Sequence, residues 1–181
     1  MSKPPRAKRL LPGSDPCLVT LPDVTVAYIH TTDDPSAVGP EAMKALYGAG
    51  YGLKFALKKE GVEFALDCPR ARWDWMPGTE VTGSLVGDWA LVVPDDTAEA
   101  DLPQKSERFP VRIARWDYGD CAWIMHLGSY DAEEPTVTRL AAFIDEQGLE
   151  IAGMHEEWYL SPPNAKVPKT VILYPVRPKK G

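Results

Sequence analysis

Short runs of alternating or continuous apolar residues, separated by Pro- and Gly-rich turns, predict a series of β-strands interrupted by two helices. The strand candidates are rich in β-branched and aromatic residues, which fit a pleated and half-buried surface. In the first half of the chain they lie at 24–30, 62–69 and 84–94. In the second half they lie at 121–127, 155–161 and 169–176, after a short candidate at 111–118.

Two segments carry apolar residues spaced by three and four, which is typical of a helix with one buried face. They span 41–61 and 134–148, and each ends on a glycine, a common helix terminator. The first helix also holds Gly48, Gly50 and Gly52. Each weakens it by about 1 kcal/mol relative to alanine. These glycines indicate close packing on a sheet, or a kink.

The element order strand, helix, strand, strand therefore occurs twice, which predicts an α+β fold. A βαββ unit covers one face of its sheet with the helix, and two such units side by side can share a groove. We expect a flexible N-terminal arm over 1–20 and a single domain over 21–181. The two halves of this domain span about 21–95 and 110–178, joined by a polar and acidic connector.

Composition narrows the class of protein. The chain has 181 residues, of which 44% are hydrophobic, so one domain with a substantial core is expected. The net charge of −6 argues against a nucleic-acid-binding surface, which needs clustered Lys and Arg. No apolar run approaches the ~20 residues that cross a bilayer, and the polar, Pro-rich start does not resemble a signal peptide. The three cysteines lack the spacing of a zinc or disulfide framework, so we expect reduced thiols in a cytoplasmic protein.

The stretch HEEWYLS at 155–161 carries the most informative chemistry. Because neighbouring side chains of a strand point to opposite faces, His155, Glu157 and Tyr159 share one face. Glu156 and Trp158 share the other face, which we expect under a helix with Glu156 near solvent. The first face suits the floor of a groove. The alternative, an open face on which water screens Glu157, remains, since one-sided antiparallel sheets are common.

Aromatic residues favour the groove. The chain has six tryptophans, and tryptophan is a rigid contact surface for flat or cationic ligands. We expect two or three of them to reach a pocket, and Trp73 and Trp75 share a strand face by spacing. The histidines are scattered over different predicted strands, so no metal site is expected, and no cofactor motif is present. A glycine cluster in the first helix lacks the strand-before-helix context of a dinucleotide fingerprint.

Several segments resemble GyrI-like small-molecule-binding domains, in particular their longer, stand-alone branch. HEEWYLSPPNAKVPKTVILYPV resembles the closing motif, in which Glu157 and Tyr159 match the family's glutamate and tyrosine. WIMHLGSYDA resembles the strand that ends in a His-x-Gly-x-Tyr turn, matched by His126, Gly128 and Tyr130. LYGAGYGLKFALKKEG and RARWDW are similar to the branch's first helix and paired-tryptophan strand. The resemblance covers about residues 20–178.

This resemblance implies a pseudo-twofold (βαββ)2 fold with two helices on one side of the sheets and a central ligand cleft. Related domains are the ligand-sensing parts of multidrug-responsive transcription regulators, where the equivalent glutamate lies at the base of an aromatic pocket and meets planar cations. No helix-turn-helix precedes the domain in this chain, so no direct contact with nucleic acid is expected. No membrane partner is expected either, since the chain lacks a long apolar run. The expected ligand-binding residues are Trp73, Trp75, Trp89, Trp123, Tyr28, His126, Tyr130 and His155.

Stand-alone members similar to this chain include hydrolases that open the strained cyclopropane of DNA-alkylating compounds. The resemblance implies Glu157 and Tyr159 as catalytic residues. A buried Glu157, with its pKa raised by apolar walls, would serve as general base for water. Tyr159 would orient that water or donate a hydrogen bond to the developing oxyanion.

Three functions therefore stand side by side. The first is a binding protein or sensor for planar or cationic xenobiotics without turnover. The second is a hydrolase acting on electrophilic molecules in the same cleft. The third is a protein-binding module, as in gyrase-inhibitory relatives. The oligomeric state is left open by the sequence.

Overall fold

The structure is a computed structural model that describes residues 10–80, 83–162 and 164–180. Its first half contains β1 (Cys17–Leu21), β2 (Val24–Thr31), α1 (Pro35–Lys59), β3 (Arg70–Trp73), β4 (Gly87–Val93), the short 3-10 helix η1 (Glu99–Asp101) and β5 (Arg112–Trp116). Its second half contains β6 (Gly119–Leu127), the 3-10 helix η2 (Tyr130–Ala132), α2 (Glu134–Glu146), β7 (Leu149–Ile151), β8 (His155–Tyr159) and β9 (Lys169–Pro178). In the described parts of the chain, no helix combines the length and the apolar character that a membrane span requires.

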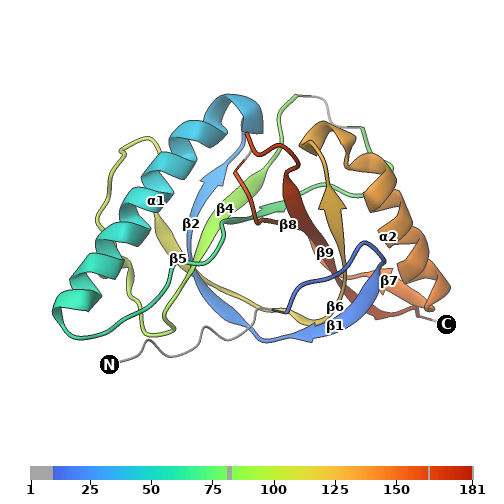
Figure 1. Cartoon of the computed structure of the whole chain (residues 1–181), viewed down its shortest axis with the longest axis horizontal. Helices are drawn as coiled ribbons and strands as arrows, with labels where there is room; N and C mark the ends of the chain where they lie inside the picture. The colour runs from blue at the N-terminus through green and yellow to red at the C-terminus, as the bar shows by residue number, and fades with distance from the viewer. Residues whose placement is uncertain (1–9, 81–82, 163, 181) are drawn as a thin grey trace.

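The strands form one antiparallel sheet whose order shows the predicted internal symmetry. The order is β1-β6-β9-β8-β3-β4-β2-β5, with β7 paired to β9 at the side. The unit β2-α1-β3-β4 therefore corresponds to β6-α2-β8-β9, and β3 pairs with β8 where the two units meet. Figure 1 shows the two units side by side, each with its helix. The α+β fold with two βαββ halves is confirmed.

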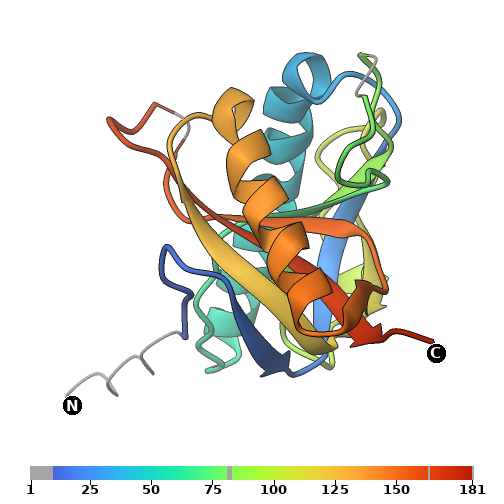
Figure 2. The ribbon, with the colours of Figure 1, turned by 90° about the vertical axis from the view of Figure 1, so that its right-hand side faces the viewer.

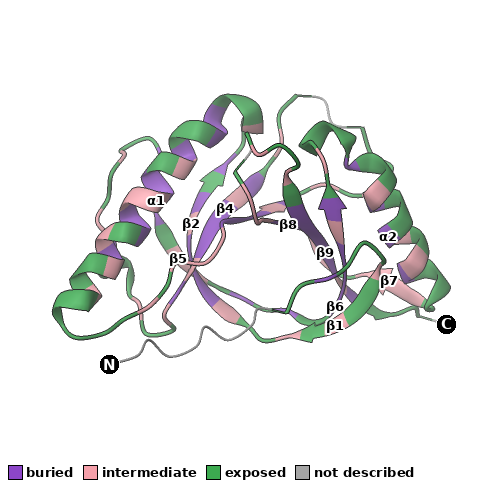
Figure 3. Ribbon diagram, in the orientation of Figure 1, coloured by how far each residue is buried: buried purple, intermediate pink, exposed green. Residues whose placement is uncertain are grey.

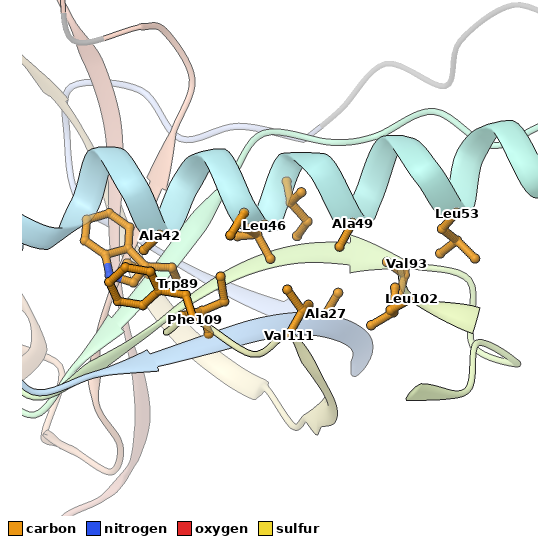
Figure 4. Close-up of a cluster of buried hydrophobic side chains, with 14 of the residues drawn as sticks. Ala27, Ala42, Leu46, Ala49, Leu53, Trp89, Val93, Leu102, Phe109 and Val111 are labelled. Atoms are coloured by element: carbon orange, nitrogen blue, oxygen red, sulfur yellow. The ribbon is translucent and has the colours of Figure 1, made fainter. Parts of the chain in front are cut away.

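Both helices cover the same face of the sheet. Ala71 of the α1 cluster and Ile172 of the α2 cluster both lie opposite Glu157 across the strands, so they share one face. In Figure 2 α2 lies in front and α1 at the back. The buried face of α1 carries Ala42, Leu46, Ala49 and Leu53, which pack on sheet residues such as Trp89 (Figure 4). Under α2, a second cluster joins Val137, Leu140 and Ile144 to residues of β6 and β9. In Figure 3 the buried positions of α1 lie toward the strands, as the three-and-four spacing predicts.

The opposite face of the sheet is also buried, because the sheet curls. β5 lies at one end of the strand order and β6 lies next to the other end, yet only residues 117 and 118 connect them. The two ends must therefore approach each other. Trp116, Trp123 and Trp158, which belong to β5, β6 and β8, pack in one cluster on this face. The cluster gives the molecule a second core on the side away from the helices.

Several elements differ from the predictions, among them β7, which was not predicted. No strand forms at 62–69; that segment has no ladder partner, and its Phe64 and Leu66 pack against the α1 cluster instead. The helix predicted from residue 41 begins at Pro35, because the Asp34 carboxylate accepts the Ser36 N–H and caps the N-terminus. Residues 17–20, placed in the N-terminal arm, belong to β1, which pairs with β6. Residues 1–9 of that arm lie outside the described residues.

The glycines of α1 confirm the close packing expected from the sequence. A Cβ added at Gly50 would lie 3.0 Å from Leu91 Cδ1 and 3.1 Å from Leu66 Cδ2. One added at Gly52 would lie 2.3 Å from Pro103 Cγ. Glycine has a low helix propensity, but a larger residue would not fit at these positions. The strand that carries Leu91 and the loop that carries Pro103 come too close to leave room for a Cβ.

Candidate functional site

The candidate site is a cleft on the helix-covered face, where the two βαββ halves meet. Its volume is about 230 Å³. The first half contributes two tryptophans and the second half contributes a histidine and several acidic residues. The lining residues are Trp73, Trp75, Leu85, Tyr130, Asp131, Glu133, Glu134, Val137, His155 and Glu157.

A larger hollow of about 850 Å³ lies along the loop at 99–111. Its charged lining residues are exposed and of both signs, such as Glu99 and Lys105. The Gln104 side chain is already bound on both sides to the Val111 backbone. No group of buried polar side chains converges there, so the smaller cleft is the better candidate for a functional site.

The pairing of β3 with β8 sets the floor of the cleft. In the register of these strands Ala71 lies opposite Glu157 and Trp73 lies opposite His155. Cross-strand partners share a face, so the carboxylate, the imidazole and the indole point to the same side. The small side chain at Ala71 leaves Glu157 room beside the strand junction. The groove predicted for this face of HEEWYLS is therefore present, beneath the helices.

His155 is held on both sides. Its Nε2 lies 2.9 Å from Glu157 Oε1, and its Nδ1 lies 2.6 Å from the Tyr174 hydroxyl oxygen. The ring is 5.1 Å from the Trp75 ring in an edge-on arrangement. Both ring nitrogens therefore have partners inside the protein, and His155 serves to orient Glu157.

The environment of Glu157 reverses one expectation. Burial raises the pKa of this carboxyl, since only 12% of the side chain is exposed. Hydrogen bonds from His155, Tyr159 and Trp73, together with the nearby imidazole, outweigh burial and hold the pKa below its usual value. The expectation that apolar walls would raise the pKa of Glu157 is wrong, because three donors converge on the carboxylate. Glu157 is an anion at neutral pH.

Glu133 has the opposite environment and was missed by the sequence analysis. It is 9% exposed, and its Oε1 has no hydrogen-bond partner among the described residues. Burial raises the pKa of Glu133 to about 9, and the negative charges of Glu157 and Asp131 contribute to that rise. Its place at the start of α2 favours the anion, by up to ~2 kcal/mol in a partly buried geometry. That corresponds to about 1.5 pKa units at about 1.36 kcal/mol each, which is less than the rise from 4.5 to about 9, so Glu133 stays protonated at neutral pH.

No local pattern distinguished Glu133 from an ordinary surface glutamate. It follows the His-x-Gly-x-Tyr turn and precedes a Glu-Pro pair, a usual start for a helix. Only the fold shows that Glu133 lies in the cleft. η2 and the start of α2 bring it over β8. One carboxylate oxygen of Glu133, one of Glu157 and one ring nitrogen of His155 therefore all lie within 4.8 Å of one another.

These three groups also form a possible set of metal ligands, although the sequence predicts no metal site. Two carboxylates and an imidazole would suit zinc or a related divalent ion. In the hydrogen-bonding pattern of the structure, however, the space between His155 Nε2 and Glu157 Oε1 is taken by a direct contact of 2.9 Å. A metal ion would have to replace that hydrogen bond and the Glu133 proton.

Aromatic rings wall the cleft and support its floor. Trp73 and Trp75 line it, as does Tyr130, whose ring packs edge-on at 5.5 Å against Tyr159. Trp89 lies one layer behind, 4.9 Å from the Trp73 ring, and donates its Nε1–H to Thr31. Burial and the Glu157 charge raise the pKa of Tyr159 well above its usual value, so its hydroxyl keeps the proton with which it bonds Glu157.

Besides Trp89, which lies behind Trp73, three of the expected ligand-binding residues do not line the cleft. Tyr28 and Trp123 point to the opposite face of the sheet, into the second core, since their strands place them in the Trp158 cluster. His126 is buried near the end of β6, where it bonds the Thr136 hydroxyl and the Ser129 carbonyl. These residues do not line the cleft, because alternation along their own strands or local turn contacts direct them away from it.

The other face of β8 also differs from the expectation. Glu156 and Trp158 were expected under a helix, with Glu156 near solvent, but the curled sheet buries this face, and Glu156 is 0% exposed. Its carboxylate accepts hydrogen bonds from Arg72 Nε at 2.7 Å, the Tyr118 hydroxyl at 2.5 Å and Trp158 Nε1 at 2.5 Å. Adjacent glutamates of one strand thus serve a buried ion pair on one side and a cleft on the other.

Comparisons with known proteins support the fold. No family model and no curated protein matches the chain. Among solved structures, an uncharacterized conserved protein from Listeria innocua matches with a TM-score of 0.79 and 22% identity, over 92% of this chain and 94% of that one. A hydrolase from Listeria innocua matches with a TM-score of 0.77 and 22% identity over the same shares of the two chains.

A third structure, the EcmrR C-terminal domain, matches with a TM-score of 0.60 and 16% identity, over 91% of this chain and 98% of that domain. Identities this low establish shared architecture and leave ligand and chemistry to the site itself. The chain has the fold of these proteins, which is the GyrI-like fold that its sequence motifs resemble.

Proposed function

We propose that this protein binds planar aromatic or cationic small molecules in the cleft between its halves and hydrolyses those that carry an activated cyclopropane. The observation that carries the proposal is the Glu157 carboxylate, which three donors surround on the floor of a cleft walled by Trp73, Trp75 and Tyr130. Such a site offers flat surfaces for stacking and a fixed negative charge for a cation or a polarised water.

The size of the cleft limits the ligand. Its volume of about 230 Å³ is just below the ~300–1,000 Å³ usual for drug-sized ligands. We expect the cleft to enclose one flat part of a larger molecule, which enters it between the tryptophans. The likeness to a hydrolase from Listeria innocua supports the catalytic part of the proposal at the level of the fold.

The residues at the floor suit a hydrolytic ring opening. A water oxygen forms a bond to a cyclopropane carbon, the strained C–C bond breaks, and its electron pair moves to the oxygen of the conjugated carbonyl. Glu157 orients the water and accepts a proton from it as the new bond forms. The three donors on Glu157 lower its basicity, so its contribution comes from position and charge more than from base strength.

The test is a fluorescence titration followed by product analysis. Ethidium, a planar cation, and a cyclopropane-fused cyclohexadienone serve as probes; quenching of tryptophan reports binding, and mass spectrometry reports addition of water. In Glu157→Gln we expect the affinity for ethidium to fall at least tenfold, because the counter-charge is lost. We expect turnover of the dienone to fall ~10²–10⁴-fold, the usual range for general acid–base help.

Glu150→Gln, a change of a glutamate on β7 whose side chain is 36% exposed, is the matched control and should leave both values unchanged. Full turnover by Glu157→Gln would remove Glu157 from the reaction. Binding of both probes without any product would support the second candidate, a non-catalytic binding protein or sensor. The low pKa of Glu157 favours that candidate, because a permanent anion holds a cation better than it removes a proton.

A further inference from the structure

We propose that Glu133 is a second catalytic residue of the cleft, the general acid that protonates the substrate oxygen on which charge develops. This inference rests on the proposed hydrolysis and names its second participant. The carboxyl group lines the cleft and its buried Oε1 has no partner among the described residues. It is therefore free to turn a proton toward a bound ligand.

The other polar groups of the floor are already engaged. His155 uses one nitrogen for Glu157 and the other for Tyr174. Tyr159 and Trp73 direct their hydrogens to Glu157. Tyr159 therefore cannot also serve as the expected oxyanion donor, because its hydrogen is directed to the carboxylate. Among the buried polar side chains that line the cleft, Glu133 is the one left with hydrogen-bonding capacity in the described residues.

The two glutamates divide the roles of acid and base by their surroundings. Glu157 meets three donors and is ionised, whereas Glu133 meets the acidic groups of Glu157 and Asp131 and no donor that an observed contact supplies. The tyrosines around it, Tyr130, Tyr159 and Tyr174, stay protonated because their pKa values are raised. The other titratable groups that line the cleft are Glu134 and His155, and His155 is bonded to Glu157. Two carboxyls held in different protonation states are the arrangement that acid–base hydrolysis requires.

The balanced step uses both groups. As Glu157 takes one proton from the attacking water, the cyclopropane C–C bond breaks and its electron pair reaches the conjugated carbonyl oxygen. Glu133 gives its proton to that oxygen. The product leaves with the elements of one water molecule added. A proton then passes from Glu157 to Glu133 and restores the starting state. A carboxylate oxygen of one glutamate lies within 4.8 Å of a carboxylate oxygen of the other.

This assignment also defines the substrate class. A neutral molecule is required whose electrophilic carbon is conjugated to a carbonyl, so that the oxygen can lie against Glu133 while the carbon faces the water at Glu157. Planarity between these two points suits the tryptophan walls. A planar cation such as ethidium has no carbonyl oxygen that could take the Glu133 proton, so it should bind without turnover.

The experiment compares Glu133→Gln with the wild-type protein. The amide has the same shape and keeps a hydrogen-bond donor, but it gives up no proton. We expect kcat for the dienone to fall ~10²-fold or more, with its binding affinity changed less than threefold. The wild-type rate should decrease as the pH rises through about 9, and this limb should be absent in the variant. Glu146→Gln, at the exposed far end of α2, is the control.

An infrared spectrum of the free protein supplies a readout that needs no substrate. At pH 7, Glu133→Gln should lose the carbonyl-stretch band of a protonated carboxylic acid. A full rate with an unchanged pH limb, or an unchanged infrared band, overturns the Glu133 assignment alone. Absence of product from the wild-type protein overturns the proposed hydrolysis and this inference with it. Activity lost to a chelator and restored by zinc would overturn it in favour of a metal at the same three residues.

Discussion

At the scale of single residues, two glutamates of the same cleft differ by their neighbours alone. Glu157 receives hydrogen bonds from three side chains, and Glu133 receives none that the structure shows. Burial acts on both and favours the neutral acid in both. The direction of each pKa is decided by whether donors offset that burial.

The raised pKa of Glu133 should appear in the pH dependence of stability. The folded protein holds this proton up to pH of about 9, whereas the unfolded chain releases it near 4.5, the ordinary value. The contribution of Glu133 is therefore complete below pH 4.5 and is lost as the pH rises toward 9. Between these limits the free energy of unfolding should fall by up to about 1.4 kcal/mol per pH unit from this group.

Urea denaturation of the wild type and of Glu133→Gln at pH 5.5, 7 and 8.5 measures this contribution. The variant has no proton to hold, so the difference between the two proteins should shift in favour of the variant as the pH rises. Equal pH slopes in both proteins would show that Glu133 is ionised in the folded state at neutral pH.

At the scale of elements, strand β8 presents two chemically distinct faces. The face toward the cleft carries His155, Glu157 and Tyr159, and the other face carries Glu156 and Trp158. Glu156 is buried against Arg72, whose side chain is 16% exposed, and it also accepts the Tyr118 and Trp158 hydrogens. We assign Glu156 to stability and Glu157 to the ligand.

Glu156→Leu should therefore cost about 3–5 kcal/mol of unfolding free energy, since it leaves the Arg72 charge without its buried partner. The control is Glu150→Gln, which removes the exposed ion pair with Arg177 and should cost about 0–1 kcal/mol. Chemical denaturation measures both. A loss below 1 kcal/mol for Glu156→Leu would contradict the role of this ion pair.

At the scale of the whole molecule, the cleft belongs to neither half alone. Trp73 and Trp75 come from the first unit, and Glu133, His155 and Glu157 come from the second. The β3–β8 ladder joins the units, and the curl of the sheet packs β5, β6 and β8 into one cluster. This continuity fixes the floor residues of the two units relative to each other.

We expect the two halves to unfold together as one cooperative domain. The guanidinium transitions followed by far-UV circular dichroism and by tryptophan fluorescence should coincide. Separate midpoints for the two probes, or a biphasic curve, would show that the halves are independently stable and that the shared ladder is weaker than its position suggests.

Much of this architecture followed from local pattern. Alternation placed Glu157 and Tyr159 on one strand face, because the period of two is a property of the extended backbone. Helical spacing and terminal glycines located α1 and α2, although the Asp34 cap extends α1 to Pro35. The order of elements predicted two βαββ units, and the motifs that resemble GyrI-like domains predicted their arrangement, which the structure confirms.

Tertiary structure alone decided the chemistry of the site. The packing of α1 and α2 decides which face of β8 the helices cover. The two-residue link between β5 and β6 brings the ends of the sheet together, and the curl buries Glu156 on the other face. The approach of Glu133 to Glu157 joins residues of different elements. Period and propensity are set by near neighbours along the chain. Burial, nearby charges and the number of hydrogen-bond donors are set by neighbours in space. They determine which of the two cleft glutamates holds the proton.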